Sequence, residues 1–103
     1  LQQHYQTQID PVLKTGWHKL GDRNQIALKR LYGQEIEVEE IAAELNETPQ
    51  SARKRIKNAC THLKDGVIVW IQVNLEVSLE PERKKVGEFV EKWLHRFYSR
   101  SFK

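Results

Sequence analysis

The chain has 103 residues and a formal net charge of +3, which is the size of one small domain with a single modest core. Its one cysteine cannot close an internal disulfide, and no apolar run approaches the roughly 18 residues of a membrane-spanning helix. These features exclude a disulfide-stapled protein and a membrane partner, and they predict a soluble, cytoplasmic domain. Because the chain lacks methionine and begins with Leu1, we expect a domain cut from a longer protein.

The first predicted helix covers residues 2–20, where apolar side chains recur every three or four positions. Its apolar residues are Tyr5, Ile9, Val12, Leu13, Trp17 and Leu20. Pro11 either opens a fresh helix capped by Asp10 or kinks a continuous one. Gly21 ends this segment, and Asp22 is the expected cap of a second helix over 23–32, which stops at Gly33. The second helix is expected to bury Ile26, Leu28, Leu31 and Tyr32.

A helix-turn-helix is predicted over residues 38–63. A short helix over 38–45 would bury Ile41, Ala42 and Leu45, with the small residues Ala42 and Ala43 where the next helix crosses it. Asn46 ends this helix because asparagine tolerates the left-handed conformation. Thr48 as a cap and Pro49 in the first turn indicate the start of a longer helix. That helix would turn inward Ala52, Ile56, Ala59, Cys60 and Leu63.

The β-branched run of residues 67–71 has the composition of a strand, but no second strand-like segment exists to pair with it. We therefore predict that the long helix continues through it. A turn over 77–80, with Ser78 as the candidate cap, leads to a last amphipathic helix. Its apolar face is Val86, Phe89, Val90, Trp93, Leu94 and Phe97. This face either packs on the first helix and the 67–71 run or serves as a docking surface.

The elements predict an all-α fold in one domain of residues 1–103: an N-terminal helix (1–20), a helix-turn-helix core (22–63) and a C-terminal helical extension (64–103). Charge is separated within the core. Six acids and no base lie between positions 34 and 47, and five bases and no acid lie between 48 and 64. Such a basic block is a candidate surface for a polyanion. The acidic run is interpreted as a solvated face or as a surface for a basic partner.

The outer face of the predicted recognition helix carries side chains that can read DNA. Glutamine and serine can hydrogen-bond base edges, while arginine and lysine bind guanine or phosphate. The candidate residues are Gln50, Ser51, Arg53, Lys54 and Lys57. We expect Arg53 to contribute base preference and Lys57 to hold phosphate.

The core resembles region four of bacterial sigma factors over about residues 20–63. The matching stretches are Asp22-Arg23-Asn24-Gln25, Leu31-Tyr32-Gly33, Val38-Glu39-Glu40-Ile41-Ala42-Ala43-Glu44-Leu45 and Thr48-Pro49-Gln50-Ser51-Ala52-Arg53-Lys54-Arg55-Ile56. The long first helix and the Trp-Leu helix near the end are similar to sigma-like proteins of cyanobacteria. The resemblance implies a cytoplasmic transcription initiation factor that binds double-stranded promoter DNA at the minus-thirty-five element and docks on the flap of the RNA polymerase β subunit.

The resemblance also implies roles for residues outside the recognition face. Arg23 and Arg30 would lean on DNA or on the flap, while Arg55 would face the domain's own acids. Three positions depart from the family: Asn46 replaces its turn glycine, Glu47 replaces an apolar residue and Ala52 replaces a buried valine. We expect weaker inner packing at Glu47 and Ala52, and negative charge from Glu47 close to the phosphates.

No constellation of catalytic or cofactor-binding residues is found, so the predicted protein is not an enzyme and carries no cofactor. The histidines are scattered, without metal-ligand spacing, and no metal site is predicted. Cys60 is interpreted as a small core residue. The alternative hypothesis is a protein-interaction module with weak or no DNA binding, whose partner is RNA polymerase, an anti-sigma factor or another regulator.

Overall fold

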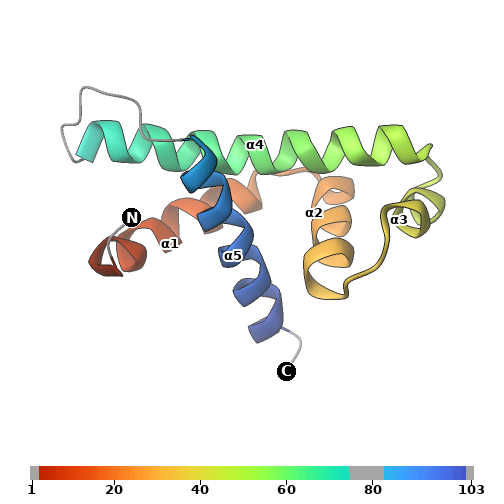
Figure 1. Cartoon of the computed structure of the whole chain (residues 1–103), viewed down its shortest axis with the longest axis horizontal. Coiled ribbons are helices and arrows are strands. Elements are labelled where there is room, and N and C mark those ends of the chain that lie inside the picture. The colour runs from red at the N-terminus through yellow and green to blue at the C-terminus, as the bar shows by residue number, and fades with distance from the viewer. Residues whose placement is uncertain (1–2, 75–82, 102–103) are drawn as a thin grey trace.

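The structure, a computed structural model, describes residues 3–74 and 83–101. Over these residues the chain forms five α-helices and no strand, so the all-α prediction is confirmed (Figure 1). The helices are α1 (Gln3–His18), α2 (Asp22–Leu28), α3 (Val38–Leu45), α4 (Pro49–Asn74) and α5 (Arg83–Ser101), and a π-helical turn, η1 (Lys29–Gly33), follows α2. The turn predicted over 77–80 and the Ser78 cap lie outside the described residues.

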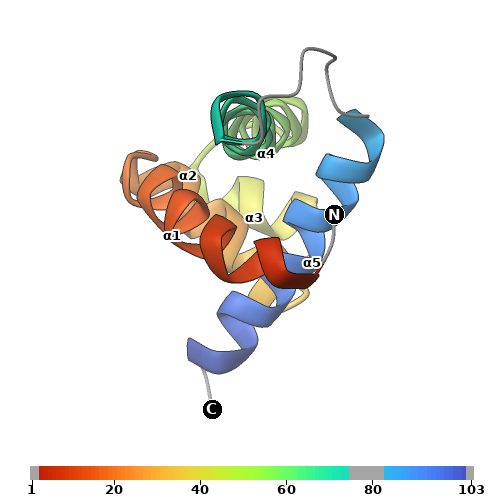
Figure 2. The same cartoon turned by 90° about the vertical axis from the view of Figure 1, so that its left-hand side faces the viewer.

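Helix α4 is the element on which the others pack. It has 26 residues, and α1, α2, α3 and α5 all contact it. Figures 1 and 2 show α4 along one edge of the molecule with the other helices on one side of it, so that its opposite face is uncovered. The prediction that the β-branched run continues the helix is confirmed, since Val67, Ile68 and Ile71 are buried inside α4.

The structure decides one open alternative and corrects one expectation in the first half of the chain. Helix α1 runs without interruption through Pro11, so of the two alternatives the fresh helix capped by Asp10 is ruled out. The residue that precedes the first turn of α2 is Gly21, whose carbonyl accepts a 3.0 Å hydrogen bond from the Gln25 amide, and Asp22 is already helical. The aspartate still lies in the first turn, where its charge suits the helix dipole.

The inward face of α2 is also shifted from the predicted one. Ile26 is 37% exposed, whereas Ala27 and Leu28 are fully buried. Successive helical residues are about 100° apart, so a face centred between Ala27 and Leu28 turns Ile26 outward. Leu31 and Tyr32 lie in η1 and are partly buried against the core, as expected. The prediction for Ala43 is wrong in the same way, because only Ala42 lies buried at the crossing with α4.

Helix α5 crosses the molecule and packs on α4 and η1. Its predicted apolar face is confirmed: Val86, Val90, Trp93 and Leu94 are buried, and Phe89 and Phe97 are partly buried. The rings of Trp93 and Phe97 stack with centroids 4.9 Å apart. The structure thus uses the C-terminal amphipathic helix as part of the core.

Candidate nucleic-acid interface

The helix-turn-helix is formed by α3, a three-residue turn and the start of α4. Asn46 adopts the left-handed conformation (φ 59°, ψ 44°), and the amide of Glu47 donates a 2.8 Å hydrogen bond back to the Ala42 carbonyl. This pattern satisfies carbonyls that a helix end leaves free. Thr48 then caps α4, because its Oγ1 accepts a 3.1 Å hydrogen bond from the Ser51 amide. The predicted stop, cap and start are all confirmed.

Glu47 is the centre of a polar network that holds this turn against α2 and α4. Its carboxylate accepts hydrogen bonds from Arg55 Nε at 2.8 Å, from Ser51 Oγ at 2.6 Å and from Arg23 Nη2 at 3.2 Å. Bonding to the Arg55 guanidinium and then to Ser51 lowers the pKa of Glu47 to about 2. The Glu47 side chain is only 10% exposed, so its charge is directed into the protein.

The two arginines of this network have structural partners. Arg55 also donates to Asn24 Oδ1 at 2.8 Å, which fastens α4 to α2. Arg23 also donates to the carbonyl of Leu45, the last residue of α3. The sequence predicts negative charge from Glu47 close to the phosphates, but in the structure guanidinium groups of Arg55 and Arg23 neutralise this carboxylate. Arg55 does face the domain's own acids, as expected.

Two further arginines pair with acids of α3. Arg30 forms a bidentate pair with Glu44, with Nε–Oε2 at 2.8 Å and Nη2–Oε1 at 2.7 Å. This pairing raises the pKa of Arg30 and lowers that of Glu44. Arg53 Nη2 lies 2.7 Å from Glu39 Oε1, and both side chains are more than half exposed. Two acids of the acidic run, Glu44 and Glu39, are therefore paired with arginines of the protein.

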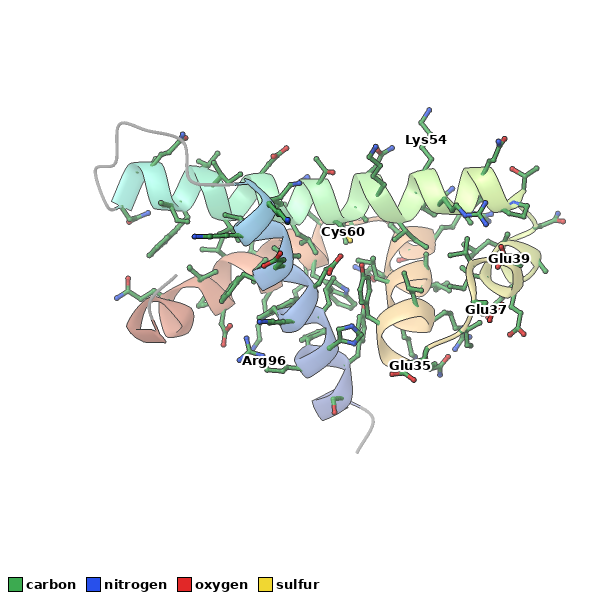
Figure 3. The ribbon with its side chains drawn as sticks, in the orientation of Figure 1. Glu35, Glu37, Glu39, Lys54, Cys60 and Arg96 are labelled. Carbon is green, nitrogen blue, oxygen red and sulfur yellow. The ribbon has the colours of Figure 1, made fainter. Side chains whose placement is uncertain are left out.

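The uncovered face of α4 carries the remaining polar side chains of the block. Gln50, Lys54 and Lys57 are exposed, and so is Asn58, one turn beyond Lys54. Figure 3 shows Lys54 pointing away from the body of the molecule, on the side opposite to the labelled acids of α3 and its approach, Glu35, Glu37 and Glu39. Of the seven residues predicted to contact DNA, three therefore lie on the free face, while Ser51, Arg53, Arg23 and Arg30 are bonded to acids of the protein.

Asn58 was missed by the sequence reasoning, although a signal was present. It lies eight residues after Gln50 and four after Lys54, and these spacings place three side chains on one side of a helix. The Glu47 network was missed because its partners come from different helices. Only the crossing of α2 and α4 brings Arg23 and Arg55 to the same carboxylate.

An apolar cleft of about 330 Å³ lies beside this face, between α4, η1 and α5. Its wall includes Leu31, Tyr32, Val38 and Ile56, and Arg53, Lys57 and Lys64 line it as well. Cys60 lies in the cleft with its Sγ 3.6 Å from Tyr32 Oη, and burial raises the pKa of the thiol. Figure 3 shows Cys60 beneath α4, in the interior.

Other classes of site find little support in the described part of the chain. No group of three or more histidine, cysteine, aspartate or glutamate side chains there is placed to hold a metal ion. Among the described helices, none is both long and apolar enough to cross a membrane.

The described residues thus form an all-helical domain with a helix-turn-helix, whose second helix carries a partly basic free face. Comparison of the chain with protein-family models, with curated proteins and with solved structures found no significant match. The function is therefore inferred from the geometry of α3, the turn and α4, together with the chemistry of the free face.

Proposed function

We propose that the domain binds double-stranded promoter DNA, with the start of α4 in the major groove, as the minus-thirty-five-reading part of a sigma-like transcription initiation factor. One observation carries the proposal: a capped helix, held at a tight left-handed turn, presents an uncovered face with Gln50, Lys54 and Lys57. Helix-turn-helix proteins read DNA with this part of the second helix. A binding role in the cytoplasm is proposed, without enzymatic activity.

The ion pairs around the turn support the proposal electrostatically. A carboxylate that faced the groove would repel phosphate, but Glu47 is turned inward and neutralised by Arg55 and Arg23. The charge of Glu39, which is exposed, is neutralised by the ion pair with Arg53. The lysines of the free face have no such counter-charge within the described residues. The surface that α4 offers is therefore positive where the groove edges would lie.

Salt dependence tests the proposal directly. Fluorescence anisotropy with a labelled duplex bearing a minus-thirty-five element should give an affinity that falls steeply between 50 and 200 mM salt, by about tenfold or more for a few phosphate contacts. Lys57→Ala should weaken binding to all duplexes and reduce the slope of log K against log salt by roughly one. Lys92→Ala, an exposed lysine of α5, is the matched control and should change neither. An affinity that does not depend on salt would overturn the proposal.

A protein-interaction module is the second candidate, and the apolar cleft favours it. Arg53 and Lys57 line this cleft and also belong to the predicted recognition face, so a partner seated there would compete with DNA. RNA polymerase through its β flap, an anti-sigma factor or another regulator are the proposed partners. A pulldown with the isolated flap, with and without excess duplex, separates the two functions. Capture of the flap by a domain that shows no salt-dependent DNA binding would favour the second.

A further inference from the structure

We propose that α4 reads adenines through the side-chain amides of Gln50 and Asn58, on either side of Lys54, and that Arg53 and Ser51, which are bonded to acids of the protein, do not read bases. This inference rests on the proposed DNA binding and names the sequence class that the same face would select. It differs from the expectation drawn from the sequence, which assigned base preference to Arg53 and omitted Asn58.

The side chains of Ser51 and Arg53 are already bonded to acids of the protein. Ser51 Oγ donates a 2.6 Å hydrogen bond to Glu47, whose carboxylate is fixed by Arg55. A serine hydroxyl has a single proton, so while this bond persists Ser51 cannot donate to a base. Arg53 donates through Nη2 to Glu39 at 2.7 Å and lies at the wall of the apolar cleft, to one side of the free face.

Three other polar side chains on the outer side of α4 remain available to a ligand. Gln50, Lys54 and Asn58 are exposed, and none of them makes a side-chain hydrogen bond to another described residue. Their spacing of four residues places them along one side of α4, each about 6 Å further along the axis. Figure 3 shows that Lys54 points away from every other helix, and Asn58 lies at the edge of this side, beside Leu20 and Asn24 of the α1–α2 junction. A duplex laid on it would meet these three side chains first.

The amide side chains of Gln50 and Asn58 can each donate one hydrogen bond and accept another. Asparagine and glutamine match adenine in the major groove, because the amide donates to N7 and accepts from the N6 amino group. Gln50 and Asn58 are about 12 Å apart along the helix, and base pairs are stacked about 3.4 Å apart, so the two adenines should be separated by roughly three to four base pairs. Lys54 lies between them and can reach guanine or phosphate.

Selection from a randomised duplex library, followed by sequencing, tests the inference in the intact chain. The unmodified protein should enrich adenine at two positions about three to four base pairs apart, each by roughly tenfold over other bases. Gln50→Ala should remove one preference and Asn58→Ala the other. Arg53→Ala should keep both while lowering the affinity for all sequences. Gln8→Ala, an exposed amide on α1, is the matched control and should keep both preferences at full affinity.

The outcomes separate this inference from the proposed function. Salt-dependent binding with a guanine preference that Arg53→Ala abolishes would overturn the adenine reading and leave the DNA-binding proposal in place. The absence of salt-dependent binding to any duplex would overturn the proposed function itself. Loss of both adenine preferences in either single amide variant, with a normal circular dichroism spectrum and melting curve, would overturn the assignment of one base to each amide.

Discussion

Trp17 Nε1 donates a 2.7 Å hydrogen bond to Tyr98 Oη, which joins the first helix to the last across 81 positions of sequence. The two rings meet edge to face with centroids 6.4 Å apart, and Phe97 packs beside both. Burial raises the pKa of Tyr98 to about 12, so the phenol stays protonated at every physiological pH. The contact closes the core on the side away from the helix-turn-helix, and it links α1 and α5 directly.

Removal of the Tyr98 hydroxyl tests how much this bond contributes. Tyr98→Phe leaves the indole N–H of Trp17 without its partner, and we expect the free energy of unfolding to fall by about 1–2 kcal/mol. A double-mutant cycle with Trp17→Phe isolates the pair, since the cavity left by the smaller ring cancels in the cycle. Urea denaturation of the four proteins should give a coupling energy of about 1 kcal/mol. A coupling energy near zero would show that the bond contributes nothing beyond ring packing.

Gly66 in α4 and Gly16 in α1, two helices in contact, should respond differently to an added methyl group. A Cβ at Gly66, in the middle of α4, would meet no atom within 4 Å, so Gly66→Ala should stabilise the domain by about 0.5–1 kcal/mol through helix propensity. A Cβ at Gly16 would lie 3.1 Å from Leu63 Cδ2, and Leu63 is buried. Gly16→Ala should therefore gain less or lose stability. Thermal melts of both variants check this, and an equal gain would show that Leu63 moves aside freely.

The Glu47 network makes stability depend on acid pH. The pKa of the Glu47 carboxyl is lowered from the ordinary 4.5 to about 2 in the folded state, so the charged carboxylate stabilises the fold. That contribution is fully present above about pH 4.5 and is lost as the pH falls from there to about 2. Glu47→Gln should be clearly less stable than the unmodified protein at pH 7, and the difference should shrink by pH 2.5. Urea denaturation at both pH values measures it.

A control separates this effect from a general loss of negative charge. Glu40→Gln removes an exposed carboxylate of α3 that has no ion-pair partner among the described residues, and it should change stability little at either pH. If Glu47→Gln and Glu40→Gln proved equally mild at pH 7, the network around the turn would not be a source of stability.

The helix-turn-helix could be predicted from the sequence because its signals are local. The left-handed stop at Asn46, the Thr48 cap and the Pro49 start each depend on the backbone of a few neighbouring residues. The inner face of α4 follows from its period, which continues unbroken through the β-branched run. The competing interpretation of the 67–71 run as a strand fails because the sequence contains no second strand-like segment to pair with it.

The features that the sequence missed depend on how helices cross. Ile26 and Ala27 are adjacent, and only the packing of α2 decides which one faces the core. The bonding of Arg53 to Glu39 depends on the turn, which brings α3 and α4 together, and Ser51 bonds Glu47 of the turn itself. The sequence was therefore enough to predict the helix-turn-helix and the basic block on its second helix. It could not tell which members of the block would be left free for a ligand.

The pairing of Arg53 with Glu39 leads to a prediction about affinity. Both side chains are more than half exposed, so the pair should contribute less than about 1 kcal/mol to stability, and Glu39→Gln should leave the melting curve nearly unchanged. The same variant frees the guanidinium for phosphate and removes a carboxylate beside the recognition face. We therefore expect DNA binding to tighten severalfold at low salt, with a slope of log K against log salt that is steeper by up to about 0.9. Glu37→Gln removes the same charge from the start of α3, on the side away from α4 in Figure 3, and should have a smaller effect. Equal effects of the two variants would mean that overall charge, and not the release of Arg53, sets the affinity.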